Sequence, residues 1–160
     1  MTRKIILISL SNISKDGRVL RQINYLSKSF HILVVGYGNP PKEFINHPNI
    51  QWMKLRRLTS TMGTIQRLFE RFFLIPFFPK LHPVFKLLHQ TACDAIHVNN
   101  WDSLPMGALL AKKAKAKLIL DIHESYDSWY WGLGTPTIKS IFRKYGKMVD
   151  ASTTVVEALA

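Results

Sequence analysis

Residues 94–124 read DAIHVNNWDSLPMGALLAKKAKAKLILDIHE, and this stretch decides the fold. It contains two apolar runs typical of buried strands, 95–98 and 117–122, with a helical pattern between them. Polar side chains follow each run at once. In a parallel α/β sheet such groups collect at the edge where the strands end, which is where these sheets bind ligands. The stretch therefore predicts a strand–helix–strand unit with a site at its carboxyl edge.

The rest of the chain shows the same alternation. Further strands are expected at 4–10, 31–37, 50–55 and 151–156, and helices at 63–75, 80–91, 103–114 and 137–148. Apolar residues at helical spacing predict another helix after the first strand: Val19, Leu20, Ile23 and Leu26. Alternating strands and helices form parallel sheets with right-handed crossovers. We predict one α/β domain over residues 1–160, a doubly wound, mostly parallel, Rossmann-like sheet of about six strands with helices on both faces.

Composition limits the kind of protein this is. With 160 residues and 47% apolar residues, the chain can bury a core and is not disordered. Its only cysteine, Cys93, allows no intrachain disulfide, so a reducing, cytoplasmic location is expected. No apolar run approaches the roughly 20 residues of a membrane span. The 22 Lys and Arg against 10 Asp and Glu favour a polyanionic partner, such as a membrane surface, a phosphorylated substrate or nucleic acid.

The turn after the first strand is where a dinucleotide-binding fingerprint would lie. Between Ser9 and Arg18 the only glycine is Gly17, so neither G-x-G-x-x-G nor a P-loop is present. Asp16 and Arg18 could instead face a ligand. Alternatively, Asp16 or Ser14 caps the helix and Arg18 is solvated.

A second group of polar residues follows the two strands of 94–124. Asp121 and His123 share one side of a strand, and Glu124 takes the other. An imidazole near neutral pH suits a hydroxylated ligand or a developing charge, although a structural histidine fits the spacing equally well. His97 lies inside a strand and is expected in the core. Together with these acids it could bind a metal, but His-Glu-x-x-His and Cys-x-x-Cys are absent, so no metal site is expected.

Residues 56–91 combine basic residues with six phenylalanines and a single acid, Glu70. Three interpretations fit this composition. The aromatic residues fill the core, or the segment rests on an anionic membrane, or it binds nucleic acid. The last is the least favoured, because no familiar nucleic-acid module is present.

Several segments, taken in order, carry a resemblance to a known family. They are residues 9–11 and 16–19 (SLS and DGRV), 94–105 (DAIHVNNWDSLP), 116–124 (AKLILDIHE) and 150–160 (DASTTVVEALA). This chain resembles the N-terminal, acceptor-binding domain of family-4 retaining glycosyltransferases, which have the two-Rossmann-domain (GT-B) architecture. The last segment looks like a strand entering another helix. We therefore expect the sequence to be part of something longer, or to work with a separate subunit.

The resemblance implies that donor and acceptor are bound by different domains. The missing C-terminal domain would bind the nucleotide-sugar, the co-substrate, and no other cofactor is expected. The catalytic residue His123 would reach the donor sugar across the cleft. A glycan or lipid-linked acceptor is expected to meet polar groups from three strand ends: Asp16, Arg18, Asn99, Asn100, Asp102 and Glu124. Residues 56–91 would rest on the inner face of the membrane. Without the donor domain, transfer by these 160 residues is not expected.

Two rival interpretations remain open at this point. The chain could be a non-catalytic, membrane-docking subunit of a split glycosyltransferase. It could also be an unrelated small-ligand or nucleic-acid binder, because a fold does not fix a function.

Overall fold

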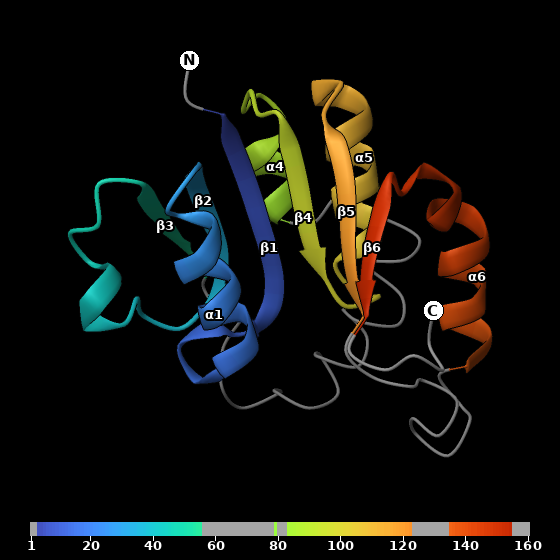
Figure 1. Cartoon of the computed structure of the whole chain (residues 1–160). Helices are drawn as coiled ribbons and strands as arrows, with labels where there is room; N and C mark the ends of the chain where they lie inside the picture. The colour runs from blue at the N-terminus through green and yellow to red at the C-terminus, as the bar shows by residue number, and fades with distance from the viewer. Residues whose placement is uncertain (1–2, 56–78, 80–82, 123–134, 155–160) are drawn as a thin grey trace.

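The computed structural model describes residues 3–55, 79, 83–122 and 135–154. Within these residues six parallel strands form one sheet, in the order β3-β2-β1-β4-β5-β6 (Figure 1). The strands are β1 (Lys4–Asn12), β2 (His31–Tyr37), β3 (Ile50–Lys54), β4 (Ala95–Asn99), β5 (Lys117–Ile122) and β6 (Ala151–Thr154). The chain runs outward from β1 to β3 and then crosses to β4. The Rossmann-like fold class expected from the sequence is confirmed.

Helices cover both faces of this sheet. Helix α1 (Gly17–Leu26) lies on one face, and α4 (Pro83–Leu88), α5 (Leu104–Ala114) and α6 (Thr135–Tyr145) lie on the other (Figure 1). Short 3-10 turns complete the described elements: η1 (Ile13–Lys15), η2 (Lys42–Phe44) and η6 (Gly146–Met148). Alternate residues of the strands serve the two faces, because successive side chains of a strand point in opposite directions.

Each face has its own apolar core. On the α1 face, Leu7 of β1 packs with Val19 and Ile23 of α1. On the opposite face, Ile6 and Ile8 belong to a larger core with the helices that follow β3. Continuous apolar runs such as Ile5–Ile8 therefore have both sides buried, as expected in a parallel sheet.

Helix α5 approaches the sheet closely because of a glycine. A Cβ added at Gly107 would collide with Val98 of β4 and would lie 3.3 Å from Leu118 of β5. Trp101, in the turn before α5, is fully buried in the same core. This close packing fixes the turn between β4 and α5.

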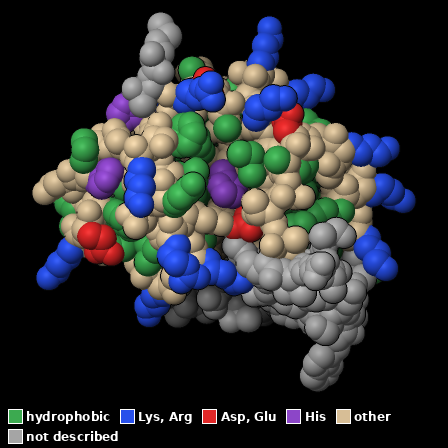
Figure 2. Space-filling model, viewed as in Figure 1, with side chains coloured by type: hydrophobic (Ala, Val, Ile, Leu, Met, Phe, Trp, Pro, Cys, Tyr) green, Lys and Arg blue, Asp and Glu red, His purple; other side chains and the backbone are tan. Residues whose placement is uncertain are grey.

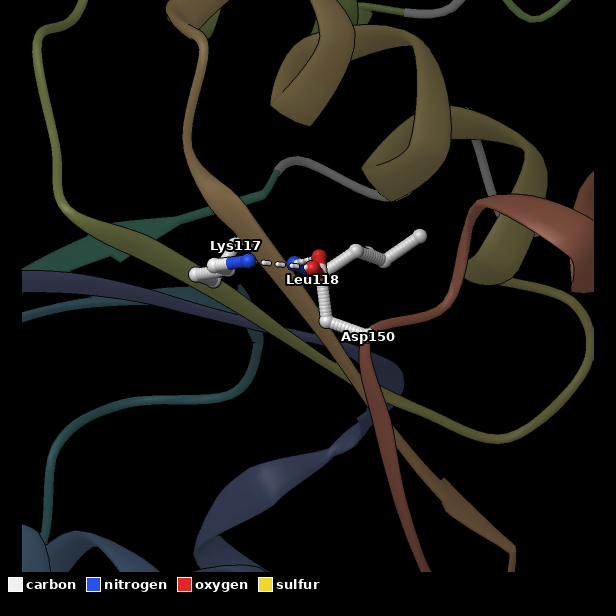
Figure 3. Close-up of polar contacts among 3 residues, drawn as sticks. All are labelled: Lys117, Leu118 and Asp150. Atoms are coloured by element: carbon white, nitrogen blue, oxygen red, sulfur yellow. Dashed lines mark hydrogen bonds and ion pairs between the residues drawn. The ribbon is translucent and has the colours of Figure 1, made fainter.

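Strand β6 is attached at its start by a carboxylate. Asp150 accepts one hydrogen bond from the Lys117 Nζ at 2.7 Å and another from the backbone N–H of Leu118 at 2.8 Å (Figure 3). Both donors belong to β5, so Asp150 fixes the position along β5 at which β6 begins. Leu118 in turn accepts from the backbone N–H of Asp150 at 2.8 Å.

Most expected elements occur, with some differences in their ends. The expected strand 4–10 continues to Asn12, because Asn12 pairs with Tyr37 of β2 after an irregularity in the register. The expected helix 80–91 appears as α4, and the helix expected at 63–75 lies outside the described residues. The helix expected at 137–148 begins earlier, at Thr135, and its last turn is 3-10. In the part of the chain that the structure describes, no helix is both long and apolar enough to cross a bilayer.

Candidate functional site

A cavity of about 500 Å³ lies where β1 passes through η1 into α1. It opens at the carboxyl edge of the sheet, beside the central strand. Its lining comes from one continuous stretch and the first turns of the helix that follows: Ser11, Asn12, Lys15, Asp16, Gly17, Arg18 and Arg21. It is an open depression at the surface rather than an enclosed cavity.

Asp16 organises the start of α1. Its Oδ1 accepts from the backbone N–H groups of Arg18 at 3.2 Å and Val19 at 3.3 Å, which makes it the N-cap. Its Oδ2 accepts from the Ser11 hydroxyl at 3.3 Å, and that hydroxyl lies 2.9 Å from the hydroxyl of Ser9. Of the two capping candidates in the sequence, Asp16 is the one that caps. Its carboxylate also lines the cavity, so capping and ligand contact are compatible.

The cavity is strongly basic. Among the described residues that line it, Lys15, Arg18 and Arg21 stand beside a single acid, Asp16. Figure 2 shows Lys and Arg side chains gathered over the part of this face where α1 lies in Figure 1. The start of a helix already carries a partial positive charge, so the lining concentrates positive potential where the strand ends.

A row of polar side chains crosses the sheet at the same level. In the register of the sheet, Ser9 pairs with Asn99, Asn99 with Asp121 and Asp121 with Thr153. The first three are almost completely buried, at 1%, 1% and 2% exposure. Asp121 accepts a 2.7 Å hydrogen bond from the Thr153 hydroxyl and another from the Gln22 side-chain amide of α1. The row ties α1 to the distant half of the sheet.

The turn after β4 has a special backbone. Asn100 has φ 68°, the left-handed region that asparagine tolerates better than most residues, and its N–H donates to the Asp121 carbonyl at 2.9 Å. Ser103 stands at the N-cap position of α5, but its hydroxyl makes no capping bond. It instead donates to the carbonyls of Asn99 and Asn100, at 2.5 and 3.1 Å. Residues 99–103 thus form a hydrogen-bonded turn.

The structure separates the predicted site residues into three groups. Asp16 and Arg18 line the cavity. Asn99 and Asp102 are buried, at 1% and 4% exposure, and are not part of its lining, while Asn100 is half-buried beside them. His123 and Glu124 lie outside the described residues. Acceptor contact by the Asn99–Asp102 turn and by His123 stays a prediction.

Some cavity residues were missed by the sequence analysis: Ser11, Asn12, Lys15 and Arg21. The sequence contains a pattern that could have identified some of these residues. Arg18 and Arg21 are three residues apart, which places their side chains on neighbouring positions of a helical surface, and Lys15 lies in η1 just before that helix. The strand character of Ser11 and Asn12 had no comparable signal, because both residue types favour turns.

Other side chains that could react or bind a metal have structural explanations. His97 is buried within β4, in register with Leu7 and Ile119, as expected of a core histidine. Burial, with a smaller contribution from Asp94, raises the pKa of the Cys93 thiol, so it stays protonated near neutral pH. Within the described residues no three His, Cys, Asp or Glu side chains are grouped closely enough to hold a metal ion.

In comparisons with known proteins, no family model and no curated protein matches the sequence of this chain. The site must therefore be interpreted from its own residues. These give a basic, hydrogen-bonding cavity at the carboxyl edge of a parallel sheet, which is where α/β folds bind ligands.

Proposed function

We propose that this chain is the acceptor-side half of a retaining glycosyltransferase, which transfers sugar from a nucleotide-sugar to a glycan or membrane-associated acceptor. The observation that carries the proposal is the cavity between β1 and α1, with Asp16 and Arg18 in its lining. A domain that closes over this edge would exclude water and bring a donor to the bound acceptor. The chain alone is not expected to transfer sugar.

The lining suits an acceptor rich in hydroxyl groups. The hydroxyl of Ser11 and the amide of Asn12 can exchange hydrogen bonds with a sugar, and the Asp16 carboxylate can accept from one. In the proposal, these groups orient the acceptor. His123, which follows β5 in the sequence, contacts the donor sugar, a role that rests on the resemblance described above.

The decisive test is transfer by the chain joined to its donor-binding domain, whether that domain is encoded in the same reading frame or in a separate subunit. The assembly is incubated with each common nucleotide-sugar and with glycan and lipid-linked acceptors, and hydrolysis is measured as well as transfer. The proposal requires a product whose anomeric configuration is that of the donor, as judged by NMR. Inversion, or neither transfer nor hydrolysis of any donor, would overturn it.

A matched pair of variants links that activity to the cavity. Asn caps helices about as well as Asp, so Asp16→Asn keeps the start of α1, while it removes the charge and the oxygen that accepts from Ser11. Its KM for the acceptor should change while the KM for the nucleotide-sugar does not. Lys28→Gln, an exposed residue beyond the other end of α1, should leave both unchanged.

A specific feature of α6 favours a second candidate, a non-catalytic subunit that brings a split glycosyltransferase to the membrane. Its outward side chains include Lys139, Arg143 and Lys144, with Lys147 just beyond, and residues 135–148 contain no acid. Its apolar side is already used in the core, through Ile138 and Ile141. Such a helix suits electrostatic contact with anionic lipid. Co-sedimentation with phosphatidylserine vesicles that Arg143→Gln weakens, without any effect of this chain's cavity variants on transfer, would favour this candidate.

A further inference from the structure

From the charges that line the cavity between β1 and α1, we infer that its ligand carries a phosphate group. This inference rests on the proposed function and narrows it: the acceptor would be a phosphorylated sugar or a lipid-linked phosphate, rather than a neutral glycan. Lys15 and Arg21 would hold the phosphate, and Ser11 and Asn12 would contact the neutral part of the molecule.

Positive side chains of the cavity lie at the end of α1 where the helix dipole is already positive. Arg18 and Arg21 lie in the first half of α1, whose first turn contains no acidic residue. Cations near the start of a helix oppose its dipole and cost stability. A Cβ placed on Gly17 would lie 3.7 Å from the Nη1 atom of Arg21. The Arg21 guanidinium is therefore directed back toward the helix start, where the potential is already positive.

Among the described residues, little negative charge neutralises the cations of the cavity. Of the described lining residues, Asp16 alone is acidic, and its carboxylate is engaged by Ser11 and by the N–H groups of Arg18 and Val19. Within the described part of the chain, Lys15 and Arg21 pair with no carboxylate. Because those N–H groups are already capped, the side-chain cations, and not the helix amides, would bind the anion. Guanidinium groups bind phosphate oxygens with paired hydrogen bonds, and lysine binds them as a point charge.

The size of the cavity and the distribution of its polar groups also suit a phosphorylated organic molecule. A cavity of about 500 Å³ is far larger than a phosphate ion alone needs. Ser11 and Asn12 lie on the β1 side of the lining, and Lys15, Arg18 and Arg21 lie on the η1 and α1 side. This separation of neutral and cationic groups fits a molecule with a hydroxylated part and a phosphorylated part.

The test measures binding of inorganic phosphate to the full chain, by calorimetry or NMR titration at low ionic strength. The wild type should bind phosphate, and added salt should weaken binding. Arg21→Gln and Lys15→Gln should each raise the Kd by about fivefold, the scale of one solvent-exposed ion pair. Arg21→Lys should recover part of the loss. Asp16→Asn should act in the opposite direction and lower the Kd, because it removes the cavity's acid while preserving the cap.

Lys28→Gln is the matched control, because it changes the net charge as Arg21→Gln does but lies outside the cavity. Absence of phosphate binding, or equal weakening by Lys28→Gln and Arg21→Gln, would overturn the inference. Circular dichroism and thermal melts verify that each variant is folded. Two further probes identify the source of the phosphate: glycerol 1-phosphate and dihexanoyl phosphatidylglycerol below its micellar concentration. Binding of either one, weakened by Arg21→Gln, supports the inference, and binding of neither contradicts it.

The outcomes separate this inference from the proposed function. If the complete enzyme transfers sugar to a neutral acceptor and the chain does not bind phosphate, the inference fails and the function stands. If phosphate binds as described and no sugar transfer occurs, the anion site stands and the glycosyltransferase proposal fails.

Discussion

Gln22 of α1 donates a hydrogen bond to the buried carboxylate of Asp121 in β5, which joins residues 99 positions apart in the sequence. The same carboxylate accepts from the Thr153 hydroxyl of β6 at 2.7 Å. Helix α1 otherwise packs on β1 and β2, through Val19 and Ile23. The hydrogen bond of Gln22 therefore attaches α1, which lines the cavity, to β5, the strand that His123 follows in the sequence.

Replacing Gln22 by Met should destabilise the fold by about 1–3 kcal/mol, because the buried carboxyl group of Asp121 loses one hydrogen-bond donor. Urea denaturation would measure this as a lower midpoint with an unchanged slope. Asn24→Met, an exposed position on the same helix, is the control and should be close to neutral. Equal midpoints for the two variants would mean that the Gln22–Asp121 bond contributes little.

Gly107→Ala should destabilise by about 1–3 kcal/mol, the usual cost of overpacking a core. The added methyl group would collide with Val98 and force α5 away from the sheet. Gly146→Ala is the matched control, because its Cβ would lie 3.9 Å from Phe142, an ordinary contact. Thermal melts of the two variants should separate clearly, and a shared melting temperature would argue against close packing of α5.

Much of the fold could be predicted because parallel strands have both faces buried. Strands β2 and β5 lie at residues 31–37 and 117–122, as the apolar runs predicted. The end of β1 could not be predicted in the same way, since Ser11 and Asn12 resemble a turn and are held in the strand only by β2.

The candidate site was harder to predict than the fold. Asp16 and Arg18 could be chosen because they follow the first strand, where such sheets bind ligands. The Gln22–Asp121 bond could not, because it depends on where α1 lies over the sheet. Burial of Asn99 and Asp102 was equally hidden, since their residue types are usually exposed.

The attachment of β6 should depend on pH at both extremes. The hydrogen bond from Lys117, and then the one from the Leu118 N–H, hold the pKa of Asp150 below its ordinary 3.8. Because the folded pKa is lowered, this stabilisation is present above 3.8 and is lost as the pH falls through the folded value. The same hydrogen bond, and then the Asp150 charge, raise the pKa of Lys117 above 10.5. Its contribution is present below 10.5 and is lost as the pH rises through the folded value.

Asp150→Asn tests this attachment. The difference in urea midpoint between wild type and variant should be constant from neutral pH down to 3.8 and should shrink below it. The difference should be small and should decrease with added salt, because the pair is exposed. A difference that does not depend on pH would show that the Asp150 charge plays no part.

In the turn after β4, two substitutions of Asn100 distinguish a role in the backbone conformation from a role in acceptor binding. At φ 68° an alanine would be strained, so Asn100→Ala should cost about 1–2 kcal/mol. Asn100→Gly adopts this conformation without strain and should stay within about 1 kcal/mol of the wild type. If the side-chain amide contacts the acceptor, both variants should raise the acceptor KM of the complete enzyme, although only the alanine variant is unstable. If Asn100→Gly keeps a normal KM, Asn100 serves the turn alone, and the acceptor contacts belong to the cavity of Asp16 and Arg18.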